Sequence, residues 1–371
     1  MDFDFSDDQQ QLRDAVRRWV DKAYGFERRR AIVEAGGFSR EVWGELAELG
    51  LTALTVPEAH GGLGLGATDV MVVMEELGRG LVMEPLSQAF VASAVLGQYA
   101  EAGLAGQWLA RVASGEALVV MAHQERQARY RLDACAATAT RSGSGYTVDA
   151  TKSLVPAGDA ADAFLVPAQL DGKLALFLVE RGASGASTQG YRTQDGSRAA
   201  ELRCQASPAT LVSAEGLAAL TLAQDVANAA LCAEGVGAME QTLHLTTDYM
   251  NQRKQFGVVI ASFQALRHRV ADMKMQLELS RSMSYYASLK MGAPEAERHV
   301  AVSRAKVQLG QSLRLVGQQS VQLHGGIGVT DEYAGSHYFK RLTQMEMTGG
   351  DTLHHLGIVS SRMQETAGVF A

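Results

Sequence analysis

The stretch RKQFGVVIASFQALRHRVADMKM, residues 253–275, interrupts a long region of helical pattern near the C-terminus. It opens with two cations, Arg253 and Lys254, followed closely by the aromatic Phe256. Cations at a helix end are often simply solvated charges. An arginine beside an exposed aromatic can instead bind phosphate through its fork of donors, while the ring supports a flat ligand. The stretch therefore leaves open a site for an aromatic ligand that carries phosphate.

The sequence around this stretch has the pattern of a helical bundle. From Leu217 onward the only proline is Pro294, and the glycines concentrate near helix ends or packing points. Gly235 and Gly237 would allow another helix to approach closely. We predict a bundle of four long helices, at about 217–250, 262–290, 295–322 and 332–367.

The N-terminal third also reads as helical. Ser6 and Gln9 have the spacing of a capping box, and a second helix is expected after Ser39. The glycine-rich residues 61–66 are expected to form a tight connection between helices. A phosphate-binding loop is disfavoured because no strand precedes these glycines and no Lys-Ser/Thr pair ends them. Helical pattern then resumes and continues to about Val112.

Between residues 117 and 212 the pattern changes to short apolar or alternating runs separated by turn residues. The runs are ALVVMA, YTVDA, AFLVPAQ, KLALFLVE and AELRC. Runs at this spacing predict strands of a compact antiparallel barrel or sandwich. The predicted fold is therefore α+β, with an N-terminal helical domain (1–115), a central β-barrel (116–213) and a C-terminal four-helix bundle (214–371).

Composition excludes several classes of protein. A formal net charge of −7 with mixed signs along the chain argues against a nucleic-acid partner. No apolar run approaches the roughly 20 residues of a membrane span, and the acidic N-terminus lacks a secretory signal. The three cysteines are scattered, and the histidines have no metal-ligand spacing, so no metal site is expected. We predict a cytoplasmic protein.

Two further stretches, QLHGGIGVTDEY from Gln322 and MEMTGGDTLHHL from Met345, complete a set of motifs. Together with residues 253–275 and the order helices, barrel, helices, they resemble the acyl-CoA dehydrogenase family over essentially the whole chain. The resemblance implies FAD, an acyl-CoA substrate and α,β-dehydrogenation to a trans-2-enoyl-CoA, as in fatty-acid β-oxidation. It also implies an electron-transfer flavoprotein as acceptor and an oligomer that is at least a dimer.

The resemblance also assigns cofactor contacts. The arginine of the first stretch is expected to reach across a subunit interface to the FAD of the other chain. The Gly-Gly pair could simply stop a helix, or it could let a ligand approach the backbone. The implied FAD residues are Arg253, Gln255, Phe256, Ile260, Phe263, Gln322, Leu323, Gly325, Gly326, Gln124, Leu154, Pro156 and Asp351.

The catalytic base departs from the family pattern. Removing the weakly acidic proton next to a thioester carbonyl needs a carboxylate whose pKa is raised by burial. The glutamate that the family uses is matched here by Gly349. The glutamate of a second branch is matched by Ala227, to within about one helical turn. Glu346, expected on the same helix one turn before Gly349, and Asp225 are weak substitutes. The catalytic residue therefore stays unassigned.

The barrel departs as well. Leu154 replaces the tryptophan that covers the flavin in the family, and Pro156 replaces a threonine at the flavin edge. Proline has no backbone N–H to donate. A flavin in this barrel would therefore be held differently.

Three hypotheses follow from these departures. The chain could be an FAD-dependent acyl-CoA dehydrogenase with a displaced base. It could be the non-catalytic small subunit of a heteromeric enzyme, completing the FAD site of its partner, since it most resembles the small subunits of bacterial pimeloyl-CoA-type dehydrogenases. It could also be a family member whose reaction needs no base, such as expulsion of a leaving group.

Overall fold

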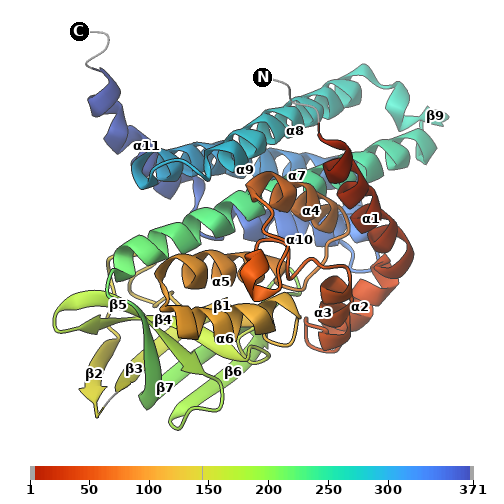
Figure 1. The fold of residues 1–371 in the computed structure, drawn as a ribbon. Coiled ribbons are helices and arrows are strands. Elements are labelled where there is room, and N and C mark those ends of the chain that lie inside the picture. The colour runs from red at the N-terminus through yellow and green to blue at the C-terminus, as the bar shows by residue number, and fades with distance from the viewer. Residues whose placement is uncertain (1–4, 144, 368–371) are drawn as a thin grey trace. The chain divides into compact units, whose positions relative to one another are not determined.

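The structure is a computed structural model that describes residues 5–143 and 145–367, with side-chain environments through residue 363 (Figure 1). The helices before the sheet are α1 (Asp7–Ala23), α2 (Phe26–Glu34), α3 (Arg40–Glu48), α4 (Ala67–Arg79), α5 (Leu86–Tyr99), α6 (Ala102–Ala113) and the short 3₁₀ helix η1 (Glu58–His60). Ser6 caps α1 in a complete capping box with Gln9, and the Ser39 side chain caps α3. Both predicted helix starts are confirmed.

The glycine-rich segment after η1 is a close-packed connection. A Cβ atom on Gly62 would overlap the backbone carbonyl of Val56, so only glycine fits there. The interpretation of these glycines as a tight turn agrees with this packing.

The sheet contains every strand that was expected. Its strands are β1 (Val119–Met121), β2 (Thr138–Ser142), β3 (Gly145–Pro156), β4 (Ala163–Leu170), β5 (Lys173–Glu180), β6 (Ala186–Arg192) and β7 (Arg198–Ser213). The strand pairings run β4–β5–β7–β3–β2 and return to β4, which closes a barrel. The strands β1 and β6 pair outside this ring, with β4 and β7 respectively.

Two features of the barrel differ from the prediction. The pairs β1–β4 and β2–β4 are parallel, so the sheet is mixed and not purely antiparallel. The strands β2 and β6 were not predicted. Their sequences, TATRS and ASTQGYR, contain no apolar run because most of their residues remain partly or fully exposed. Hydrophobic pattern therefore does not mark them as strands.

After the barrel come α7 (Gly216–Gln252), α8 (Gln264–Lys290), α9 (Glu295–His324), α10 (Ala334–Met347) and α11 (Thr352–Ala367). Between them lie the short strands β8 (Lys254–Gln255) and β9 (Val258–Val259) and the 3₁₀ helices η2 (Ile260–Ser262) and η3 (Gly325–Val329). The prediction of one helix over 332–367 is wrong. Gly349 and Gly350, with φ angles of 67° and 112°, leave the helical region and separate α10 from α11.

By packing, the chain divides into two compact units. Unit 1 consists of Met1–Arg29, Ala67–Val82 and Asn228–Ala371. Unit 2 consists of Arg30–Gly66 and Met83–Ala227, and it contains the whole barrel. The three predicted domains, with their two boundaries, remain a prediction.

The helix α7, which belongs to unit 1 from Asn228 onward, is a mostly buried core helix. By length and composition alone it could cross a membrane, contrary to the expectation that no segment would, but 72% of its most apolar window is buried inside the protein. Its glycines permit close packing, as predicted. A Cβ on Gly237 would overlap the backbone carbonyl of Glu75 on α4, and a Cβ on Gly78 would overlap that of Glu234. Thus α4 and α7 meet backbone to backbone.

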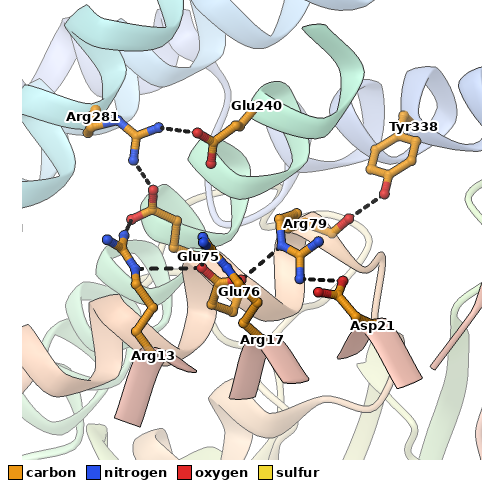
Figure 2. A network of polar contacts seen from close by, with 9 residues as sticks. All are labelled: Arg13, Arg17, Asp21, Glu75, Glu76, Arg79, Glu240, Arg281 and Tyr338. Carbon is orange, nitrogen blue, oxygen red and sulfur yellow. Dashed lines mark hydrogen bonds and ion pairs between the residues drawn. The ribbon is translucent and has the colours of Figure 1, made fainter. Parts of the chain in front are cut away.

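A network of ion pairs and hydrogen bonds also holds unit 1 together. Its residues are Arg13, Arg17, Asp21, Glu75, Glu76, Arg79, Glu240, Arg281 and Tyr338 (Figure 2). Arg13 of α1 contacts both buried glutamates of α4, Glu75 at 3.1 Å and Glu76 at 3.5 Å. Arg281 of α8 pairs with Glu75 from another side. Burial raises the pKa of Glu75, and the arginines Arg281 and Arg13 oppose that rise. The buried carboxylates therefore link α1, α4 and α8.

Candidate functional site

The four residues Thr348–Asp351, here named the TGGD loop, connect α10 to α11, and the sequence led us to expect a base position here. Asp351 caps α11, since its Oδ1 accepts the backbone N–H of His354 at 2.8 Å. The loop carries glycine at position 349. Position 349 therefore has no side-chain carboxylate.

Glu346 occupies a structural position on the far side of the same break. Its Oε1 atom accepts the backbone N–H of Thr352 at 3.1 Å and the Thr352 hydroxyl at 2.8 Å. The carboxylate thus reaches from α10 to the first turn of α11, where unpaired N–H groups favour negative charge. The expectation that Glu346 shares one continuous helix with Gly349 is wrong, because α10 ends at Met347.

Three buried donors fix the TGGD loop. Lys306 Nζ donates to the carbonyls of Met345 at 3.0 Å and Thr348 at 2.8 Å. Asn228 Nδ2 and His355 Nε2 both contact the carbonyl oxygen of Gly349, at 3.2 and 3.0 Å. The backbone carbonyls of the loop are therefore held by side chains from α7, α9 and α11.

The titratable donors of this cluster, Lys306 and His355, are buried and bound to carbonyls of the loop region. Burial lowers the pKa of Lys306 to about 8, and neighbouring Cys232 and Glu346 oppose that fall. Burial, followed by the charge of Lys306, lowers the pKa of His355 to about 3. The Gly349 carbonyl can only accept, so His355 carries its proton on Nε2 while Nδ1 faces the Ser303 hydroxyl at 3.1 Å. A neutral imidazole with so low a pKa is a poor base.

The second position expected to carry a base belongs to unit 2. Asp225 and Ala227 both lie in that unit, and Asp225 is 1% exposed. The TGGD loop belongs to unit 1.

Two residues that hold the loop, Lys306 and Asn228, were not predicted, because a lone polar residue inside an apolar helical pattern gives no sign of what its side chain contacts. The same holds for His355.

The stretch that follows α7 is a strained hairpin. The strands β8 and β9 pair Lys254 with Val259 and Gln255 with Val258. The two turn residues, Phe256 and Gly257, have φ angles of 53° and 81°. That conformation suits a two-residue hairpin but costs a non-glycine residue about 1–2 kcal/mol. Phe256 is nevertheless 91% exposed, so the fold holds a large aromatic ring in water at the tip.

The other implied residues of this stretch divide into two groups. Arg253 and Gln255 are exposed beside Phe256, and Phe263 meets the Phe256 ring edge to face at 6.2 Å. Ile260 is buried in the core of the bundle, so its side chain faces away from the hairpin surface. The exposed group presents a cation and aromatic rings together.

The second motif ends α9. Gln322, Gly325 and Gly326 are exposed, whereas Leu323 packs in the core. Gly325 stops the helix with a φ angle of 65°, as predicted for a helix end. A Cβ on Gly325 or Gly326 would meet nothing within 4 Å. Open space over a bare backbone is where a ligand can approach closely.

In the barrel, Leu154 lies on an irregular part of β3, where the register with β7 shifts. Its φ angle is 53° and it is 44% exposed. Its backbone N–H donates to the Tyr191 hydroxyl at 3.1 Å. Pro156, two residues on, has no N–H. The backbone N–H of Leu154 is therefore already bonded, and Pro156 has none to offer. The contact from Tyr191 was not predicted from the sequence.

A buried ion pair supports this part of the barrel. Lys152 is fully buried, and its Nζ lies 2.6 Å from Glu125 Oε1. Burial pushes the pKa of Glu125 up, but hydrogen bonds from Lys152 and the Ala136 backbone outweigh it and leave the pKa lowered. The carbonyl of Gln124 accepts the Ser153 N–H at 2.8 Å. Gln124 thus acts through its backbone in fixing β3.

Comparisons with known proteins agree with this architecture. The family model for the acyl-CoA dehydrogenase N-terminal domain matches residues 6–116, and that for the C-terminal domain matches residues 214–364. The acyl-CoA dehydrogenase IpdE2 of Mycobacterium tuberculosis (strain ATCC 25618 / H37Rv) is 31% identical over 337 residues, covering 90% of this chain and 91% of that protein.

Two solved structures are similar over nearly their full length. A variant of the Tcur3481-Tcur3483 steroid ACAD is 30% identical with a TM-score of 0.89, covering 97% of this chain and 99% of that chain. The ChsE4-ChsE5 complex from Mycobacterium tuberculosis is 26% identical with a TM-score of 0.91, covering 98% of this chain and 99% of that chain.

Proposed function

This chain belongs to the acyl-CoA dehydrogenase family, FAD-dependent oxidoreductases that act on CH–CH bonds, and on that premise we propose that it is the subunit without a base in a heteromeric acyl-CoA dehydrogenase. Its partner would be a homologous chain that carries the catalytic glutamate. Two of the similar solved structures carry the names of two different chains, which supports a hetero-oligomer over a homo-oligomer.

The observation that carries this proposal is the TGGD loop. Gly349 presents a backbone carbonyl, and that carbonyl is held by Asn228 and His355. Glu346 and Asp351, the carboxylates nearest in sequence, both accept backbone N–H groups of the first turn of α11. A general base must be able to reach the substrate proton. These two carboxylates are committed to holding the loop.

The chain's exposed motifs fit the phosphate and adenine end of FAD. Arg253 offers a bidentate guanidinium, Phe256 offers an exposed ring, and Gly325 and Gly326 offer an open backbone. FAD, when bound, supplies the hydride acceptor. We propose that this chain contributes these groups to FAD held mainly by the partner.

The chain's own barrel suits a flavin ring less well. The N–H of Leu154 is used by Tyr191, and Pro156 has none. The ring's hydrogen-bonding edge would find few donors here. We therefore assign the flavin ring to the partner's barrel.

The substrate and acceptor follow from the family. We propose an acyl-CoA thioester, with electrons passed to an electron-transfer flavoprotein, and a cytoplasmic location. The resemblance to small subunits of pimeloyl-CoA-type dehydrogenases makes pimeloyl-CoA the first thioester to test. A steroid acyl-CoA is the second, because a similar solved structure is named as a steroid ACAD.

The substitution Glu346→Gln tests whether the nearest carboxylate is a displaced base. In the assembled oligomer we expect the rate of flavin reduction by acyl-CoA to stay within about twofold of wild type. The glutamine oxygen can still accept from Thr352, so only the negative charge beside the first turn of α11 is lost, and the free energy of unfolding should fall by less than about 1 kcal/mol. Glu295→Gln, at an exposed carboxylate in the first turn of α9, is the matched control. A fall in rate of about 100-fold with flavin still bound would identify Glu346 as the base and refute the proposal.

A further inference from the structure

His324 lies between two tyrosines in unit 1. Its ring is 4.6 Å from that of Tyr249 on α7 and 5.0 Å from that of Tyr333, which precedes α10. Its Nε2 atom is 2.8 Å from the Tyr333 hydroxyl, and its Nδ1 atom is 2.8 Å from the carbonyl oxygen of Ser320. The residue is 4% exposed. Both nitrogens of this buried ring are therefore paired.

The partners fix the protonation of the ring. The Ser320 carbonyl can only accept, so Nδ1 carries the proton and Nε2 accepts from the Tyr333 hydroxyl. Burial lowers the pKa of His324, while hydrogen bonds to the backbone of Ser320 and Leu245 oppose that fall. The Ser320 hydroxyl also lies 3.0 Å from that of Thr246, which ties this cluster to α7. The Ser320 carbonyl, the Tyr333 hydroxyl and the Tyr249 ring thus together set the orientation of His324.

His324 connects the two exposed motifs. On one side, the Tyr249 carbonyl accepts the backbone N–H of Arg253 at 2.8 Å, and the Arg253 carbonyl accepts the N–H of Ile260 at 2.8 Å, which closes the base of the hairpin. On the other side, His324 is the last residue of α9, directly before Gly325, and Tyr333 lies beyond the loop that Gly325 begins.

We propose that His324 is a positioning residue that holds the 253–260 hairpin and the 325–333 loop at one fixed spacing. This inference rests on the proposed function, in which both segments contact a single FAD. A rigid pair of contact segments, set at a matching distance before binding, lowers the cost of binding one extended dinucleotide. His324 takes no part in the chemistry at the substrate.

Hydrogen–deuterium exchange of the full chain tests the coupling without any ligand. Tyr333→Phe removes only one hydroxyl, and His324→Leu removes both hydrogen bonds of the ring. We expect amides of both 325–333 and 253–260 to exchange about five to ten times faster in Tyr333→Phe, and faster still in His324→Leu. Tyr286→Phe, on α8, is the matched control and should leave both segments unchanged.

A second readout separates positioning from plain destabilisation. In the assembled oligomer, Tyr333→Phe should weaken FAD binding about threefold to tenfold and leave kcat at saturating FAD unchanged. If only the 325–333 loop responds in exchange while the hairpin does not, the inference is wrong. If the coupling is present but the wild-type oligomer holds no FAD, the proposed function fails and the coupling stands.

Discussion

Replacing Arg253 by alanine is expected to release FAD from the assembled oligomer, weakening its affinity about tenfold to hundredfold. The loss of a charge-assisted, two-pronged contact to a phosphate is worth about 1.5–3 kcal/mol. The backbone of Arg253 is fixed by Tyr249 and Ile260, so the guanidinium is presented from a rigid base. Flavin fluorescence released on dilution of each variant measures the change. The folding of the lone chain should be unaffected, because the side chain is exposed.

The variant Arg253→Lys is the matched control for charge. It keeps the cation and loses the fork, so its affinity should fall between those of wild type and Arg253→Ala. If Arg253→Ala binds FAD as tightly as wild type, the hairpin does not contact the cofactor. The proposed role of this chain in completing a partner's site would then be wrong.

Gly237→Ala is expected to lower the free energy of unfolding by about 3 kcal/mol. The added methyl would overlap the carbonyl of Glu75 and lie 2.9 Å from the backbone nitrogen of Arg79, so α4 and α7 would have to separate. That shift would also disturb the buried carboxylates of Glu75 and Glu76, whose arginine partners come from α1 and α8 as well as α4. Chemical denaturation of the full chain measures the loss.

Gly235→Ala, two residues earlier on the same helix, is the control for this prediction. Its methyl would meet only the side-chain ends of Leu309 and Leu313, which can rotate away. Alanine is also a better helix former than glycine by about 1 kcal/mol. The net change should be near zero. Equal losses for the two variants would contradict a backbone-to-backbone crossing at Gly237.

Much of the fold follows from local pattern. The helix starts at Ser6 and Ser39 and the strands with apolar runs could be predicted, because capping residues and hydrophobic periodicity are local. The strands β2 and β6 could not, because their residues are mostly exposed and their pairing comes from neighbouring strands. The break at Gly349 could not, because a glycine pair is tolerated inside a helix and the helical pattern continues on both sides of it.

The site was predictable only in part. Arg253 and Phe256 could be identified as a cation beside an aromatic ring, and both are exposed. The matching of Gly349 and Ala227 to the family's base positions stays a prediction. The clamp of Lys306, Asn228 and His355 could not be predicted, because it depends on which buried side chains face one loop. The same limit applies to the hydroxyl of Tyr191, which accepts the N–H of Leu154 from a distant strand.

We propose above all that this chain has no base of its own. The most direct test is the chain expressed alone, with flavin content taken from absorbance and pimeloyl-CoA and other acyl-CoAs then added without oxygen. We predict little or no bound flavin, and no bleaching of whatever flavin is present until a glutamate-bearing partner chain is added. Rapid bleaching by the lone chain would contradict this proposal, because a base would then have to exist within this sequence.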